Sequence, residues 1–228
     1  MRRREFTVGA LAAGVWGLGA GGIAQAAGLD HAEATQGVRL ALERGAVAAI
    51  TELGQLDGFM GNPKVRIPLP GFLEDAAKLL KATGHQQDVD NLILSMNRAA
   101  EKAVPEARTM LVQAAKNITV DDAVKIVRGG ETSVTDYFAG KTRGPLTDRF
   151  LPIVYRATER EALAARYNLV AGKASKLGLV KGDATTLQRH VTAKALDALY
   201  MLIGEKEREI RRDPLGTGSN ILRKVFGG

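Results

Sequence analysis

The hydrophobic residues beyond position 30 recur at intervals of three and four, the spacing that places them on one face of an α-helix. No apolar/polar alternation of the kind expected for a strand runs longer than four residues. The pattern therefore predicts an all-α fold, a single multi-helix domain over residues 30–228. The expected helical segments are 30–53, 72–83, 88–104, 106–118, 119–128, a short one around 134–138, 145–170 and beyond, 186–212, and an apolar tail at 221–226.

Helix-boundary residues refine this picture. Asp30-x-x-Glu33 and Thr119-x-x-Asp122 have the form of N-terminal caps, in which a short polar side chain accepts a hydrogen bond from a free backbone N–H. Pro105 should break or kink the helix that precedes it. Pro145 suits the first turn of a new helix, and Pro152 predicts a kink within that helix. Asp183 or Thr185 should cap the longest helix, after a loop at 178–182.

Residues 54–71 differ from the rest of the chain. Seven glycines and prolines punctuate this segment, and proline biases the residue before it to an extended backbone. A long loop inside a compact domain often has a function. Candidate binding residues on it are Phe59, Met60, Lys64, Arg66 and Ile67. We expect Phe59, Met60 and Ile67 to be exposed for a ligand, with the alternative that they pack the loop against the domain.

The first 26 residues predict a cleavable signal peptide. Arg3-Arg4-Glu5-Phe6 fits the core of a twin-arginine signal, an uncharged run extends from Thr7 to Ala24, and Ala24-Gln25-Ala26 provides small residues for a signal peptidase. Polar Thr7 stands where the twin-arginine motif usually has an apolar residue, so general export is the alternative route. A membrane anchor is the alternative to cleavage, because about 18 residues is near the lower limit for spanning a bilayer. We expect a periplasmic protein without a membrane span after cleavage.

Composition narrows the function classes. Removing residues 1–26 would take away three arginines and one glutamate, lowering the formal charge from +7 to +5, and the two signs alternate along the chain. Aromatic residues make up only 5% of the sequence, so a stacking platform for nucleic acid is not expected. The chain has no cysteine, which excludes disulfides, thiol nucleophiles and a lipoprotein anchor.

Five segments together resemble an exported bacterial family, the domain of unknown function 4197. They are Gly58-Phe59 with 64–70, Ser95–Ala103, Thr119 with 121–123, Thr192-x-Lys194-Ala195-Leu196-Asp197, and Leu222-x-Lys224-Val225-Phe226-Gly227. The resemblance covers residues from about 35 to 228, and the Asn-Arg-Ala-Ala-Glu and Pro-Leu-Pro segments are its most specific parts. It implies a helical exported domain and no known reaction.

A polar cluster is the main candidate for chemistry. Asn97, Arg98 and Glu101 are three or four residues apart on one predicted helix, and Lys194 and Asp197 repeat this spacing on another. Asp122 completes the candidate set. These side chains could present a guanidinium and a carboxylate to an anionic ligand, or could form a partly buried network that joins helices, and the second interpretation is favoured.

Metal and cofactor motifs are not found. His31, His85 and His190 share no ligand spacing, the glycines form no phosphate-binding loop, and no serine lies in a nucleophile elbow. We therefore expect no metal and no cofactor. Two function classes stay open: a non-enzymatic binding or interaction module for a small apolar ligand or an envelope protein, and an enzyme of unrecognised type that uses Arg98 and Glu101. The sequence favours the first.

Overall fold

The computed structural model describes residues 31–176 and 184–227, and every element in these ranges is helical. The all-helical single domain predicted from the sequence is confirmed. The elements are α1 (His31–Leu53), α2 (Gly71–Ala82), α3 (Gln86–Ala103), the 3-10 turn η1 (Val104–Ala107), α4 (Arg108–Lys116), α5 (Val120–Val127), α6 (Ser133–Arg160), α7 (Leu163–Ser175), α8 (Ala184–Arg212) and α9 (Asn220–Phe226).

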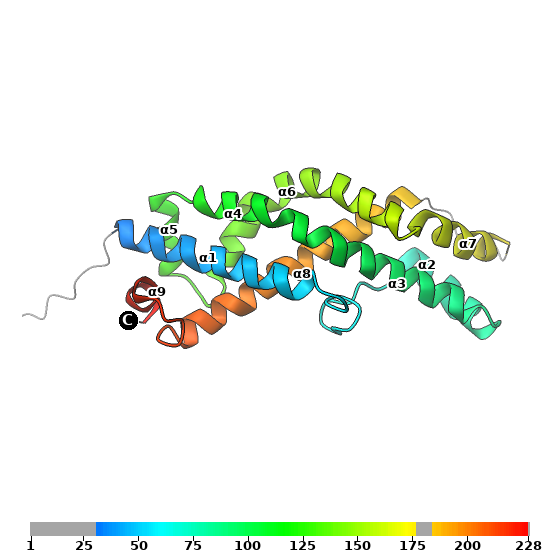
Figure 1. Cartoon of the computed structure of the whole chain (residues 1–228), viewed down its shortest axis with the longest axis horizontal. Helices are drawn as coiled ribbons and strands as arrows, with labels where there is room; N and C mark the ends of the chain where they lie inside the picture. Colours follow the sequence, from blue (N-terminus) through cyan, green and yellow to red (C-terminus); the bar gives the residue numbers. More distant parts are fainter. Residues whose placement is uncertain (1–30, 177–183, 228) are drawn as a thin grey trace, which may run out of the picture.

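The helices form an elongated bundle (Figure 1). The long helix α8 crosses behind α1 and packs against both α1 and α6, while α3 packs against α6 and α7. Helices α5 and α9 lie at the end of the bundle where α1 begins, and α2 and α7 lie at the other end. No helix in the described part of the chain is long and apolar enough to cross a membrane. The expected signal peptide, the 178–182 loop and the Asp183 cap lie outside the described residues.

Two of the predicted boundaries are confirmed by backbone geometry. The Thr119 side chain accepts a hydrogen bond from the backbone N–H of Asp122 and so caps α5. Pro105 lies in η1, the tight turn that separates α3 from α4. Local chemistry decided both boundaries, which is why the sequence alone located them.

The prediction of two helices between residues 133 and 160 is wrong. A single helix, α6, runs through both Pro145 and Pro152. A proline inside a helix removes one backbone hydrogen bond, at a cost of about 3 kcal/mol. Burial of a stripe of large apolar side chains on α6 against α8 and α3, including Phe138, Phe150 and Val154, outweighs this cost. The chain instead breaks at Ala162, whose φ of 52° is left-handed.

The C-terminal tail docks on the bundle as helix α9. Leu222 and Val225 are buried, and Val225 lies directly over Gly37 of α1. A Cβ atom at Gly37 would be only 2.6 Å from Val225 Cγ2, so only glycine allows this approach of the two helices. The Arg211 guanidinium lies 4.7 Å from the centre of the Phe226 ring and covers the other side of the tail.

Candidate functional site

The 54–71 loop is held down by side chains of α3. Asn97 is completely buried, and its amide pairs with both backbone groups of Ile67: the Ile67 N–H donates to Asn97 Oδ1 at 2.8 Å, and Asn97 Nδ2 donates to the Ile67 carbonyl at 3.0 Å. A third hydrogen bond joins Asn97 Nδ2 to the Ile93 carbonyl at 2.8 Å. Asn97 thereby fixes the extended second half of the loop, where few backbone groups would otherwise have partners.

Glu101 and Arg98 hold the first half of the same loop. Glu101 is only 4% exposed, and its Oε1 accepts hydrogen bonds from the backbone N–H groups of Phe59 and Met60, both at 3.1 Å. Arg98 Nη1 donates to Glu101 Oε2 at 2.6 Å, and Arg98 Nη2 reaches Asp57 at 2.8 Å. These bonds, with desolvation as an opposing effect, raise the pKa of Arg98, and its hydrogen bond to Glu101 is the largest cause.

The side chains expected to be exposed on the loop are mostly inside. Phe59 and Ile67 are both fully buried, so the prediction of exposure is wrong and the alternative, that they pack the loop down, is what the structure shows. Met60 is half-buried. The exposed Lys64 forms an ion pair with Glu205 of α8 at 3.0 Å. Exposed Arg66 lines a shallow groove together with Pro68, Leu69 and residues of α2 and α3.

The other members of the candidate polar cluster lie in different places. Asp197 pairs with Arg143 of α6 at 2.7 Å, and Lys194 lies 3.9 Å from Asp197 on the surface of α8. Asp122 stands at the start of α5, where it accepts a hydrogen bond from the Thr119 hydroxyl. The structure therefore brings together Asn97, Arg98 and Glu101, and it gives Asp122 and the pair of Lys194 and Asp197 separate partners.

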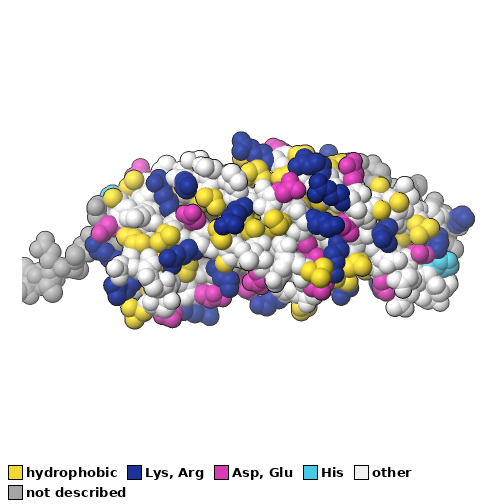
Figure 2. All heavy atoms as spheres, viewed as in Figure 1, with side chains coloured by type: hydrophobic (Ala, Val, Ile, Leu, Met, Phe, Trp, Pro, Cys, Tyr) yellow, Lys and Arg dark blue, Asp and Glu magenta, His cyan; other side chains and the backbone are white. Residues whose placement is uncertain are grey.

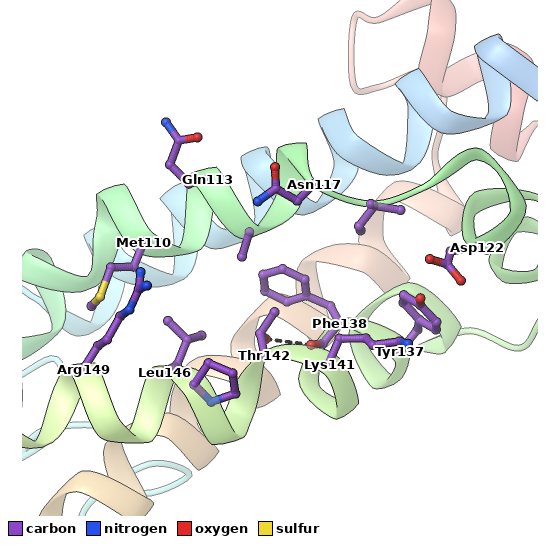
Figure 3. A pocket seen from close by; sticks show the side chains of 13 residues that line it. Met110, Gln113, Asn117, Asp122, Tyr137, Phe138, Lys141, Thr142, Leu146 and Arg149 are labelled. Carbon is purple, nitrogen blue, oxygen red and sulfur yellow. Dashed lines mark hydrogen bonds between the residues drawn. The ribbon is translucent and has the colours of Figure 1, made fainter.

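A groove of about 360 Å³ lies between α4 and α6 (Figure 3). Helix α4 borders one side and α6 the other, and the start of α5 closes one end. Its lining residues are Met110, Gln113, Ala114, Asn117, Ile118, Asp122, Tyr137, Phe138, Lys141, Thr142, Pro145, Leu146 and Arg149. Of these residues, only Asp122 is among the functional candidates predicted from the sequence.

The floor of the groove is apolar. Ile118, Phe138 and Leu146 are buried beneath it, while Met110 and Ala114 lie half-buried at its α4 edge. Leu146 and the Phe138 ring face the space between the two helices (Figure 3). This floor is continuous with the main core, because Ile118, Phe138 and Leu146 belong to the main hydrophobic cluster and Met110 and Ala114 pack against it. The groove therefore offers apolar contacts to a ligand, and its lining side chains leave the space open.

Polar groups gather at the α5 end of the groove. Desolvation first, and the nearby Asp122 carboxylate second, raise the pKa of Tyr137 to about 12. The hydrogen bond from the Thr119 hydroxyl is the largest cause that lowers the pKa of Asp122, and the nearby Tyr137 hydroxyl is the next. Lys141 Nζ lies 5.6 Å from the centre of the Tyr137 ring. At this end of the groove the negative charge of Asp122 is therefore stabilised by the Thr119 hydroxyl, the Tyr137 phenol and the nearby Lys141 ammonium.

The opposite end carries Arg149. Its guanidinium extends from α6 toward Met110 of α4 (Figure 3). In the described ranges, Arg149 has no carboxylate within ion-pair distance, whereas Arg143 and Arg156 of the same helix pair with Asp197 and Glu106. Nothing in the sequence marks Arg149 as different from its neighbours, because its lack of a partner depends on how the helices pack.

No cluster of three or more His, Asp or Glu side chains that could hold a metal ion occurs among the residues that the structure describes. His190 instead donates from Nε2 to the Pro68 carbonyl at 2.9 Å and joins α8 to the loop. Burial lowers the pKa of His190, and the hydrogen bond to the Pro68 carbonyl opposes this shift.

These features define an all-helical domain with a clamped loop and a ligand-sized groove. The chain belongs to the family described as protein of unknown function DUF4197, whose family model matches residues 28–227. The resemblance found in the sequence is therefore confirmed. No curated protein and no solved structure matches the chain.

Proposed function

We propose that this domain is a non-enzymatic binding module that holds a small, largely apolar ligand in the groove between α4 and α6. The observation that carries the proposal is an apolar floor beneath a space of about 360 Å³ with polar groups at its ends. Binding sites for small molecules have volumes in the range of about 300–1,000 Å³ and combine apolar walls with a few placed polar groups.

The side chains that hold the 54–71 loop support this assignment, because their polar groups are not free to meet a substrate. The hydrogen-bonding groups of Asn97 and Glu101 are already used by the loop backbone, by the Ile93 carbonyl or by Arg98. An active site needs groups that are free to meet a substrate. We therefore propose that Asn97, Arg98 and Glu101 are scaffold residues, which weakens the alternative of an enzyme built on Arg98 and Glu101.

We further propose that the protein works in the periplasm after removal of residues 1–26. The basic start, the uncharged run and the Ala24-Gln25-Ala26 exit support this. Amino-terminal sequencing of the exported protein should begin at Ala27, and an intact amino terminus would contradict cleavage. Replacing both Arg3 and Arg4 with Lys should block export if the route is twin-arginine, and undiminished export would assign the general route instead.

The binding proposal is tested with a variant that fills the groove. Ala114→Phe should place a ring over the apolar floor from the α4 side, and Ala164→Phe, at an exposed position of α7 outside the lining, is the matched control. Native mass spectrometry of protein isolated from the periplasm should show a small-molecule adduct on the wild type and on Ala164→Phe, and none on Ala114→Phe. An adduct retained by Ala114→Phe, or its absence from all three proteins, would contradict the proposal.

A further inference from the structure

The two cations of the groove differ in their surroundings. Lys141 lies against the Tyr137 ring, and its charge is close enough to Asp122 to help lower the pKa of that carboxyl. Arg149, at the other end, has no carboxylate partner within the described part of the chain. A guanidinium at the rim of an apolar groove is well suited to hold an acid group, since it offers two parallel N–H donors.

We propose that the ligand is an amphipathic monoanion, with a carboxylate or similar acid group on Arg149 and an apolar tail along Leu146 and Phe138. This inference rests on the proposed function of the groove. Lys141 and Arg149 are eight residues apart on α6, which corresponds to about 12 Å along a helix. The apolar floor lies between them, so a tail of about that length runs from the Arg149 end to the α5 end.

The position of Asp122 explains why a ligand with one acid group should bind in the groove more tightly than a ligand with two. Its carboxylate stands at the far end of the groove, where the tail of the ligand ends. A second acid group there would meet this negative charge, and like charges at close range oppose binding. The Lys141 ammonium lies over the Tyr137 ring and is close enough to the same carboxylate to help lower its pKa. The groove is therefore asymmetric, with an open cation at one end and an occupied carboxylate at the other.

Isothermal titration with ten-carbon probes below their micellar concentrations tests this asymmetry. The probes are decanoate, decanol, decyltrimethylammonium and the dianion decanedioate. Wild-type protein should bind decanoate about tenfold or more tightly than decanol, the range expected for a hydrogen-bonded charge pair. Decyltrimethylammonium and decanedioate should bind more weakly than decanoate.

Two variants assign the effect to named residues. Arg149→Gln should weaken decanoate to the level of decanol and leave decanol unchanged, whereas Arg160→Gln, at an exposed position of α6 outside the lining, should change neither. Asp122→Asn should reduce the difference in affinity between decanoate and decanedioate. Equal binding of decanoate and decanol, or a normal decanoate affinity in Arg149→Gln, would overturn the anion inference while the groove could still bind apolar molecules. Failure of every probe to bind, in protein with a normal thermal melt, would overturn both the inference and the proposed function.

Discussion

Glu101 and Arg98 lie one helical turn apart on α3 and join at 2.6 Å, and the glutamate is almost completely buried while the arginine is 21% exposed. The pair faces the loop, since Glu101 also accepts the backbone N–H groups of Phe59 and Met60. A buried carboxylate with three partners stabilises a fold only while all of them are present, because any group left behind is desolvated and unpaired.

Replacing Glu101 with Ala should therefore destabilise the domain strongly. The change leaves two backbone N–H groups and the Arg98 guanidinium without their acceptor, and breaking a buried pair costs roughly 3–5 kcal/mol. Arg98→Ala should also destabilise, and the double variant should lose less than the sum of the two. Denaturant unfolding measures these values. Lys78→Ala, which removes an exposed ion pair with Asp75, is the control and should cost about 0–1 kcal/mol. Normal melting of both Arg98→Ala and Glu101→Ala would end the scaffold interpretation.

Glu207 repeats this arrangement at another place in the bundle. Its side chain is 4% exposed, its oxygens accept the backbone N–H groups of Val134 and Thr135 at 3.0 and 2.8 Å, and Arg211 pairs with it at 3.0 Å. A carboxylate from α8 thus caps the amino terminus of α6, where the helix dipole also favours negative charge.

Loss of this cap should loosen the start of α6. We expect Glu207→Ala to lower the free energy of unfolding by roughly 3–5 kcal/mol, as for other buried carboxylates with several partners. Amide hydrogen exchange should accelerate at the first turn of α6. Glu209→Ala lies two residues away, removes only an exposed pair with Lys206, and should change stability by about 0–1 kcal/mol. Equal stabilities for the two variants would show that the cap contributes little.

The contact between Gly37 and Val225 gives a prediction about α9. Gly37→Ala should destabilise by about 1–3 kcal/mol because the new methyl group would overlap Val225. Gly45→Ala, on the same helix, would meet Ile203 Cγ2 at 3.5 Å, an ordinary contact, and should be neutral or stabilising.

Truncation after Pro214 should lower the Tm by several degrees, because it removes the docked helix α9. An unchanged Tm on truncation would instead indicate that the tail serves to bind a partner.

Tyr137 gives a prediction about pH. Because its pKa is raised from 10.0 to about 12 in the folded protein, the neutral phenol contributes stability that is complete below about pH 10 and lost as the pH rises toward about 12. Ultraviolet difference titration should show a tyrosine that ionises near pH 12 and is missing in Tyr137→Phe. Asp122→Asn should lower that pKa, because the carboxylate charge near the phenol is removed. A Tyr137 transition near pH 10 in the wild type would contradict the raised pKa.

The sequence was most informative where structure is decided locally. Helical periodicity and the cap at Thr119 depend on residues within a few positions of each other, and these predictions are confirmed. Pro145 was expected in the first turn of a new helix and lies inside α6 instead, because burial of Phe138 and Phe150 against other helices outweighs a lost backbone bond. Phe59 was expected outside, and it is inside because its backbone is held by Glu101, 42 residues away.

The groove could not be predicted for the same reason. Its walls come from α4 and α6, and the spacing of apolar residues on each helix does not say where two helices separate. Arg149 looks like any surface arginine of α6 until the partners of Arg143 and Arg156 are known. Family membership itself could be found in the sequence, because it rests on short motifs and needs no knowledge of the packing.

The surface offers a useful contrast to the groove. On the face shown in Figure 2, lysines and arginines lie interspersed with acidic side chains and with apolar patches. In the described part of the chain several basic residues pair with acidic ones, as in the bonds between Lys102 and Glu161 and between Arg156 and Glu106. A surface that mixes both signs of charge is typical of a solvated face.

The most direct test of the binding proposal is to map where a probe sits. Backbone and methyl NMR spectra of residues 27–228 should be recorded during a titration with decanoate. If decanoate binds between α4 and α6, the largest chemical-shift changes should occur at Ala114, Phe138, Thr142 and Leu146, with small changes at Lys64, Arg66 and Leu69 of the loop. Chemical-shift changes concentrated at the loop, with the α4 and α6 signals unmoved, would contradict the binding proposal.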